Sequence, residues 1–329
     1  MLFRSWSKLR NATKAATLRY LASQEGRNFA MTMVVSELAN SYYELLALDA
    51  QLDVVKQNID IQKNALAVVK LQKEAAKVTE LAVKRFQAEV LKNQSRQFNI
   101  QQQIVETETR INFLLGRFPQ RVDRSTQRFV DIVPPLVHAG VPTQLMENRP
   151  DVKQAQLELT AANLDFRVAK VSFYPSLGLN VSIGLQSFDF LKIVSLPASL
   201  VYGIAADILA PLFNRNALTA AYFASNAKQR QAVFHFERAI LNGYNEVYKL
   251  MAMIQNLEQS NNLQAQQVEK LTQSIDISSQ LFASARADYM EVLLTRRDAL
   301  EAQIDLIENK KRQMSASVSL YQALGGGWR

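Results

Sequence analysis

Apolar residues recur along most of the chain at the spacing of an α-helix. Between residues 7 and 76 no Pro occurs, and Gly26 is the sole glycine. Apolar side chains follow one another there at steps of three, four and seven residues, which predicts a long helix with one apolar stripe. The stripe includes Leu52, Val55, Ile59, Leu66 and Val69.

The helical pattern breaks at residues 77–80 and resumes from about 81 to 115. Gly116 follows this second stretch and suits the end of a helix, with Pro119 just beyond it. Residues 117–142 are basic, rich in Pro and without a regular period. We therefore predict two long helices followed by a loop-rich connector.

A third helix is expected to begin around Asn148. Asn148 suits the position before the first turn, Pro150 suits the first turn itself, and Asp151 is favourable at the positive end of the helix. The helical pattern continues from there and ends before Pro175.

Two stretches alternate apolar with small or polar residues, which predicts a β-hairpin. Each has about the 9–11 residues that a strand needs to cross a bilayer. The pattern fits equally a membrane hairpin and a soluble hairpin with one buried face. In the first strand the apolar residues are Leu177, Leu179, Val181, Ile183 and Leu185, and in the second they are Leu200, Tyr202, Ile204, Ala206 and Ile208.

The last part of the chain is helical again and repeats the first part. We predict a helix from 214 to about 285, a turn near 286–289, and a helix to Leu324. Three short matches indicate a duplicated helical hairpin. Asn40, Tyr42 and Glu44 match Asn242, Tyr244 and Glu246 at an offset of 202 (242 − 40), residues 89–91 match 291–293 at the same offset, and Leu115-Gly116 matches Leu324-Gly325 at 209 (324 − 115). The second half therefore holds seven more residues, one heptad, which keeps the apolar seam in phase.

Helices of about 70 residues would be on the order of 100 Å long. Their apolar stripes are narrow, whereas a helix in a globular core needs a stripe at least about 100° wide. Narrow stripes suit helices that pack only against lateral neighbours, as in the wall of a hollow tube. We expect the chain to divide into a first hairpin (1–116), a connector (117–147), a helix leading to the strands (148–174), the strand hairpin (175–213) and a second hairpin (214–329).

Composition excludes several classes of function. The net charge of +8 comes from Lys and Arg spread beside Asp and Glu, so we read them as solvated helix faces and expect no nucleic-acid partner. No Cys is present, and His138 and His235 lie far apart. No Gly-rich phosphate loop, set of metal ligands or nucleophile with a base is visible. We therefore predict no catalytic residue, no cofactor and no metal. No run of about 18 apolar residues occurs, so no transmembrane helix is expected either.

Three stretches of the sequence resemble the TolC-like outer-membrane efflux factors, the outer-membrane channels of resistance-nodulation-division type tripartite pumps. The match covers nearly the whole chain. The stretches are Asn148-Arg149-Pro150-Asp151 with the helix that follows to Tyr174-Pro175-Ser176, then Ala210-Pro211-Leu212-Phe213-Asn214-Arg215, and finally Leu320-Tyr321-Gln322-Ala323-Leu324-Gly325-Gly326-Gly327-Trp328.

The resemblance implies a mainly α fold of long antiparallel helical hairpins that form a coiled-coil duct, joined to a short transmembrane β-hairpin. It also implies a homotrimer in the outer membrane of a Gram-negative cell, with its β-barrel in the lipid and its duct in the periplasm. Such a channel exports drugs, metals or other small molecules passively and contributes to multidrug resistance. Its partners would be a periplasmic adaptor (membrane fusion) protein and an inner-membrane pump, which selects the substrate. The first predicted strand would then face lipid with Leu177, Leu179, Val181, Ile183 and Leu185.

The sequence departs from the family pattern in two places. Family members begin with a signal peptide, commonly a lipidated cysteine, and a first pair of strands, which the start of this sequence does not match. We therefore expect it to be a fragment of a longer chain of the family type, with its first repeat truncated. Many relatives also carry an aspartate after the leucines at the hairpin tip, where this chain has Leu294.

The hairpin turns hold the candidate gate. Opposite charges and an aromatic residue lie within a few helical turns of each other, so they could close the periplasmic end, although surface charge explains each residue equally well. The candidates are Arg286, Asp288, Tyr289, Met290, Glu291, Leu294, Arg296 and Arg297. The alternative function, a non-channel periplasmic coiled-coil adaptor or scaffold, would account for the helices but not for the two strands.

Overall fold

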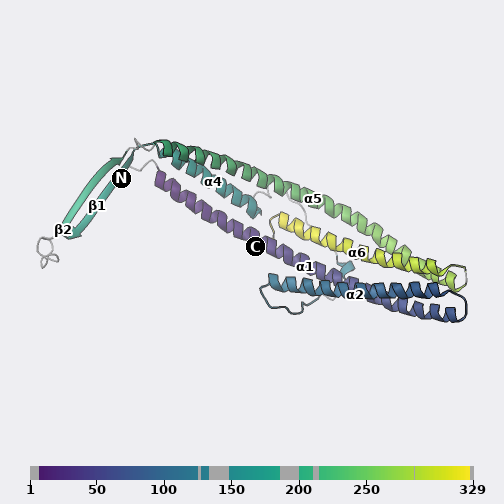
Figure 1. The fold of residues 1–329 in the computed structure, drawn as a ribbon. Coiled ribbons are helices and arrows are strands. Elements are labelled where there is room, and N and C mark those ends of the chain that lie inside the picture. The colour runs from purple at the N-terminus through teal and green to yellow at the C-terminus, as the bar shows by residue number, and fades with distance from the viewer. Residues whose placement is uncertain are drawn as a thin grey trace. The chain divides into compact units, whose positions relative to one another are not determined.

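The computed structural model describes residues 7–124, 127–132, 148–185, 200–209, 215–284 and 286–326. Most of these residues are helical, which confirms the mainly α class (Figure 1). None of the helices in these ranges is long and apolar enough to cross a membrane. The elements are α1 (Lys8–Glu74), α2 (Glu80–Leu114), the short 3-10 helix η1 (Phe129–Asp131), α4 (Pro150–Val171), β1 (Ser176–Leu185), β2 (Leu200–Leu209), α5 (Arg215–Ala283) and α6 (Tyr289–Ala323).

The helix ends follow from local backbone chemistry. α1 and α2 are joined by a short turn in which Ala76 has a φ of 56°. α2 ends one residue before Leu115, and Gly116 then takes a φ of 66°, a conformation that costs a glycine little. Its N–H donates to the carbonyl of Phe113, and the N–H of Arg117 donates to that of Asn112. These bonds satisfy carbonyl groups that the helix end would otherwise leave open.

The second hairpin corresponds to the first at an offset of 209 residues from its turn onward. α1 ends at Glu74 and α5 at Ala283, a difference of 209 (283 − 74). The residues that precede α2 and α6, Thr79 and Asp288, differ by the same number (288 − 79) and have nearly equal backbone angles. The seven extra residues of the second repeat therefore lie in α5, before the turn.

The sequence-based pairing of residues 89–91 with 291–293 is wrong by one heptad. At the observed offset Val83 corresponds to Val292, and Val90 corresponds to Ala299, and all four residues are buried. A shift of seven residues leaves the apolar stripe in phase. The stripe alone therefore could not fix the register, whereas the position of the turn does.

One compact unit consists of the described residues up to 28 and of those from 150 to 242. In it α4 packs against the first part of α1 through a small apolar cluster. α4 and the residues after it also contact the first part of α5. The ring centroid of Tyr222 in α5 lies 5.2 Å from that of Phe166 and 6.0 Å from that of Phe173. The helix after the connector therefore serves as the packing partner of both long helices in this unit.

The same unit contains the predicted hairpin, in which β1 and β2 pair antiparallel. The register sets Leu177 opposite Ile208 and Val181 opposite Ile204, so the apolar positions of the two strands occupy the same face. Ser182 lies opposite Gly203 on the other face. The other side chains of the two strands lie outside the described residues. Their orientation toward lipid, predicted for Leu177, Leu179, Val181, Ile183 and Leu185, stays a prediction.

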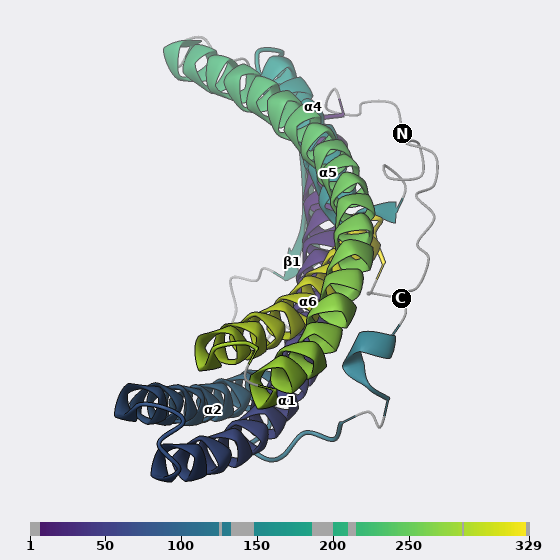
Figure 2. The same ribbon diagram turned by 90° about the vertical axis from the view of Figure 1, so that its right-hand side faces the viewer.

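The second compact unit comprises residues 29–149 and 243–329. It holds both hairpin turns, seen end-on in Figure 2, in which α1 lies beside α2 and α5 beside α6. The five segments predicted from the sequence follow the internal repeat and not these two compact units. That division of the chain stays a prediction. Of the predicted connector, the structure describes residues 117–124 and 127–132.

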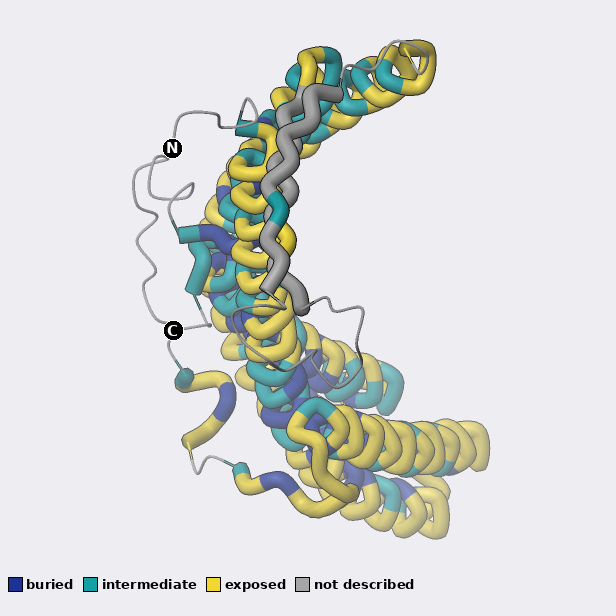
Figure 3. Tube along the Cα trace, turned by 90° about the vertical axis from the view of Figure 1, so that its left-hand side faces the viewer, coloured by how far each residue is buried: buried dark blue, intermediate teal, exposed yellow. Residues whose placement is uncertain are grey.

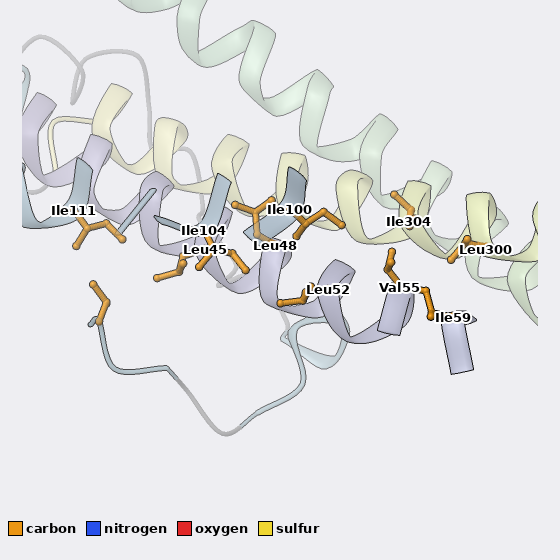
Figure 4. Close-up of a cluster of buried hydrophobic side chains, with 11 residues drawn as sticks. Leu45, Leu48, Leu52, Val55, Ile59, Ile100, Ile104, Ile111, Leu300 and Ile304 are labelled. Carbon is orange, nitrogen blue, oxygen red and sulfur yellow. The ribbon is translucent and has the colours of Figure 1, made fainter. Parts of the chain in front are cut away.

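Apolar packing in this second unit centres on α1 (Figure 4). The predicted stripe is confirmed, because four of its five residues are buried and Leu66 is half-buried. α2 and α6 both pack against α1, while exposed residues dominate the outer surfaces of both hairpins (Figure 3). The cluster contains Leu45, Leu48, Leu52, Val55 and Ile59 of α1, Ile100, Ile104 and Ile111 of α2, Leu300 and Ile304 of α6, and Val122.

Candidate functional site: the turns of the two hairpins

The first turn is closed by an ion-pair cluster on the surface. The carboxylate of Glu80 lies 2.5 Å from the ammonium of Lys73, which is on the other side of the turn, and 3.6 Å from that of Lys84. The hydrogen bond from Lys73 is the main cause that lowers the pKa of Glu80. Glu80 also occupies the first turn of α2, where a negative charge is favourable.

An apolar cluster beneath this turn joins the two hairpins. Val83 and Phe86 of α2 are buried there with residues of α1. Tyr289 and Leu293 of α6 pack against the same cluster. The candidate aromatic Tyr289 therefore contacts the first hairpin of its own chain.

The charged candidates of the second turn are placed differently. Arg286, Asp288 and Glu291 are exposed. Asp288 precedes α6 in extended conformation, but its carboxylate makes no capping hydrogen bond. Within the described ranges none of the three forms an ion pair. The structure therefore brings them to one turn without joining them to each other.

Two of the remaining candidates, Met290 and Arg296, contact neighbouring helices. Met290 Sδ accepts a hydrogen bond from Arg85 Nη1 of α2 at 2.9 Å. Arg296 donates to Ser279 Oγ of α5 at 3.4 Å, and burial lowers its pKa while Asp276 acts in the opposite direction. Two further candidates remain at the surface.

Of these two, Arg297 donates to the adjacent Asp298 at 3.0 Å, and this hydrogen bond raises the pKa of Arg297. Leu294 is exposed. The turns thus combine charge with exposed apolar surface. In the described part of the chain no cluster of His, Cys, Asp or Glu could hold a metal ion.

The sequence did not predict two arginine side chains that link separate elements of this unit. Arg124 of the connector donates to Asp49 of α1 at 2.9 Å and to Glu108 of α2 at 2.6 Å. Burial lowers the pKa of Arg124, but the hydrogen bonds to Asp49 and Glu108 and the charges of these two carboxylates together raise it above its ordinary value. Arg149 forms a comparable joint at the C-terminal end of α6. Neither arginine stands in a periodic pattern, so only the fold reveals its partners.

Comparison with known proteins settles the family. The family described as outer membrane efflux protein matches residues 2–117 and 141–326, most of the chain. The chain belongs to the outer membrane efflux protein family. It is therefore an outer-membrane channel subunit of an efflux system, which confirms the function and location expected from the resemblance.

Curated relatives match along almost the whole chain. The pyoverdine export outer membrane protein OpmQ of Pseudomonas putida is 29% identical over 324 residues, which cover 98% of this chain and 68% of OpmQ. The cation efflux system protein CusC of Escherichia coli O6:H1 is 26% identical over 325 residues, covering 98% of this chain and 70% of CusC.

Solved structures show the same fold. A crystal structure of CusC has a TM-score of 0.90 at 24% identity and covers 98% of this chain and 75% of that one. The outer membrane protein VceC of Vibrio cholerae has a TM-score of 0.88 at 24% identity, with 98% and 77% covered. These likenesses place the helical hairpins of this outer membrane efflux protein in the TolC-like fold.

Proposed function

We propose that three copies of this chain form a passive export duct, with the long helices side by side in its periplasmic wall. The observation that carries the proposal is the packing order in the unit with the hairpin turns. α2 packs on α1 and α1 on α6 through buried apolar clusters. α6 packs on α5 through a third apolar cluster and a hydrogen bond from Asn309 to Gln264. Near the turns α2 also contacts α6. Along the rest of this series α2 and α5 are the two outer helices.

Each outer helix carries an exposed apolar stripe on its open side. On α2 the stripe is Leu91, Phe98 and Val105, at steps of seven residues, and Phe98 is 68% exposed. On α5 the exposed apolar surface includes Tyr244 and Tyr248, which are four residues apart, and Tyr248 is 70% exposed. Such stripes at helical spacing are the kind of surface that a partner helix covers.

The stripes lie on different helices, so α2 of one copy would meet α5 of the next. A head-to-tail contact of this kind generates a ring when its rotation closes. Water would then contact the inner and outer faces of the wall, in keeping with the few buried residues of α5, which are Gly243, Val247 and Ser278. Three copies are what the family resemblance implies.

The hairpin would be this chain's share of the barrel that crosses the outer membrane. Both strands are ten residues long, within the range that a tilted membrane strand needs. Their register sets the apolar positions on one face and Gly, Ser, Asn and Asp positions among those of the other. We assign the first face to lipid and the second to the lumen.

The duct would perform no chemistry, and energy and selection would come from its partners. The relatives named above export pyoverdine or cations, and another relative, TtgI of Pseudomonas putida, is a toluene efflux pump outer membrane protein. We propose that this chain likewise exports small molecules, together with a periplasmic adaptor and an inner-membrane pump that dock at the periplasmic end.

The open stripe of α2 provides the test of assembly. In Phe98→Asp a carboxylate would replace a ring at the centre of the proposed seam, so the trimer is expected to dissociate. Asn99→Asp adds the same charge beside the stripe and serves as the matched control. Light scattering after size-exclusion chromatography in detergent gives the mass of each variant. Trimers of unchanged stability in Phe98→Asp would contradict the seam.

A further inference from the structure

Arg149 stands where the chain enters α4, and the residue is only 6% exposed. Its Nη1 atom donates to Glu246 Oε2 of α5 at 2.8 Å. The same atom donates to the backbone carbonyl of Ala323, the last residue of α6, also at 2.8 Å. One guanidinium therefore binds both α5 and the C-terminal end of α6.

Two glycines make room for this arrangement. A Cβ atom on Gly243 would lie 3.1 Å from Nε of Arg149, so the arginine stem crosses α5 where that helix has no side chain. A Cβ atom on Gly325 would lie 2.5 Å from the carbonyl oxygen of Asn148, and Gly325 has a φ of 86°. The backbone before α4 thus touches the backbone after α6.

The chemistry of a helix end explains why an arginine suits this place. The last carbonyl groups of a helix lack partners within the helix and carry a partial negative charge. A planar guanidinium can donate to a carbonyl and to a carboxylate at once, whereas a lysine offers a single flexible ammonium. Arg149 therefore satisfies Ala323 while Glu246 balances its buried charge.

The internal repeat supplies a comparison. Glu246 corresponds to Glu44 in the first repeat at the offset of 202 (246 − 44). Glu44 pairs at 3.3 Å with Arg110, whose side chain is 51% exposed, against 7% for that of Arg149. The same glutamate position thus pairs with an exposed arginine in one repeat and with a buried arginine in the other, while both glutamates stay partly exposed.

We propose that Arg149 is a positioning residue that couples the C-terminal end of α6 to α5 around Glu246, so that these two segments open together. The coupling fixes the C-terminal end of α6. The N-terminal end of the same helix lies at the hairpin turn. The inference rests on contacts within one chain, so it stands or falls independently of the proposed trimer.

Hydrogen exchange measured by mass spectrometry on the purified full chain tests the coupling. In Arg149→Lys we expect the amides of residues 244–250 and 320–326 to exchange about ten- to hundredfold faster, the range expected for loss of a hydrogen bond to a charged group. Amides at the first hairpin turn should keep their rates. The matched control, Arg110→Lys, weakens the exposed pair with Glu44 and should change neither segment.

A second variant covers the case in which Arg149→Lys does not fold. Glu246→Gln keeps the bond from Arg149 to Ala323 and weakens only the charge pair, so both segments should accelerate by up to about tenfold. Wild-type rates in both variants would overturn the proposal. So would faster exchange of residues 320–326 alone, since Arg149 would then be a helix cap without coupling. Uniform acceleration of the whole chain would also contradict it.

Discussion

Buried amide side chains interrupt the apolar seams between the long helices. Asn93 of α2 is 1% exposed and donates to Gln62 Oε1 of α1 at 3.0 Å. Asn309 of α6 donates to Ser260 and Gln264 of α5 at 3.1 and 2.7 Å. A buried polar pair of this kind can specify the register of two helices at some cost in stability. The stripe pattern could not reveal it, because these residues are polar at seam positions.

The pair of Asn93 and Gln62 gives a prediction at the residue scale. Asn93→Ala leaves the buried Gln62 oxygen without its donor, which should cost about 1–3 kcal/mol of stability. Denaturant unfolding followed by circular dichroism measures the loss. Asn99→Ala, on an exposed part of the same helix, should stay within about 0.5 kcal/mol. Equal losses in the two variants would show that the seam pair contributes nothing specific.

The first hairpin turn gives a prediction at the scale of an element. Lys73 and Lys84 lower the pKa of Glu80, so Glu80 stabilises the folded turn above its unfolded pKa. This contribution is lost as the pH falls through the lowered, folded-state pKa. Protection of residues 75–84 from hydrogen exchange, corrected for intrinsic rates, should therefore decline on acidification. In Glu80→Gln this pH dependence should disappear, whereas Glu74→Gln should keep it. A decline that persists in Glu80→Gln would assign it to another group.

The strand hairpin allows a second prediction at this scale. Val181 lies on the apolar face of β1 and the adjacent Ser182 on the other. If the apolar face meets lipid, Val181→Arg should cost roughly 2–4 kcal/mol near mid-bilayer and Ser182→Arg much less. Unfolding of the assembled channel from lipid vesicles compares the two. Equal tolerance of arginine at both positions would contradict the lipid assignment.

Element positions were predictable from the sequence because helices and strands leave strong periodic signals. The predicted helix that starts near 81 begins at Glu80, and the predicted last helix ends at Ala323 beside the expected Leu324. Partners between elements were not predictable in the same way. The contacts of Arg124 and Arg149 depend on the folded geometry. The pairing of 89–91 with 291–293 was wrong by seven residues, and a shift of seven residues leaves the apolar stripe unchanged.

At the scale of the whole molecule, the two hairpins are packed against each other at their turns. Tyr289 and Leu293 of the second hairpin pack against the cluster around Phe86 of the first. Arg85 and Met290 add a contact between α2 and α6. Separating the turns within one chain would expose this apolar cluster to water. We therefore expect the periplasmic end to open mainly by movement between copies.

A closed end would then depend on residues that point away from this cluster. Arg286, Asp288 and Glu291 are exposed at the turn before α6 and form no ion pair within the described part of one chain. We predict that Asp288 or Glu291 pairs with basic residues of a neighbouring hairpin. Exposed pairs are worth only about 0–1 kcal/mol each. Repeated in every copy of the ring, they would form a lock weak enough for an adaptor to release.

Neutralising Arg286, Asp288 and Glu291 together, as Arg286→Gln, Asp288→Asn and Glu291→Gln, should therefore raise the conductance of the assembled channel in planar bilayers. Asn at position 288 keeps a residue that favours a helix start, so α6 should begin at the same place. Lys63→Gln with Asp60→Asn is the matched control, because these two exposed residues of α1 pair with each other and are not gate candidates. Conductance equal to that of the unmutated channel would eliminate the ionic lock. The apolar candidates Met290 and Leu294 would then be the residues that narrow the channel. Their replacement by Ser should raise the conductance instead.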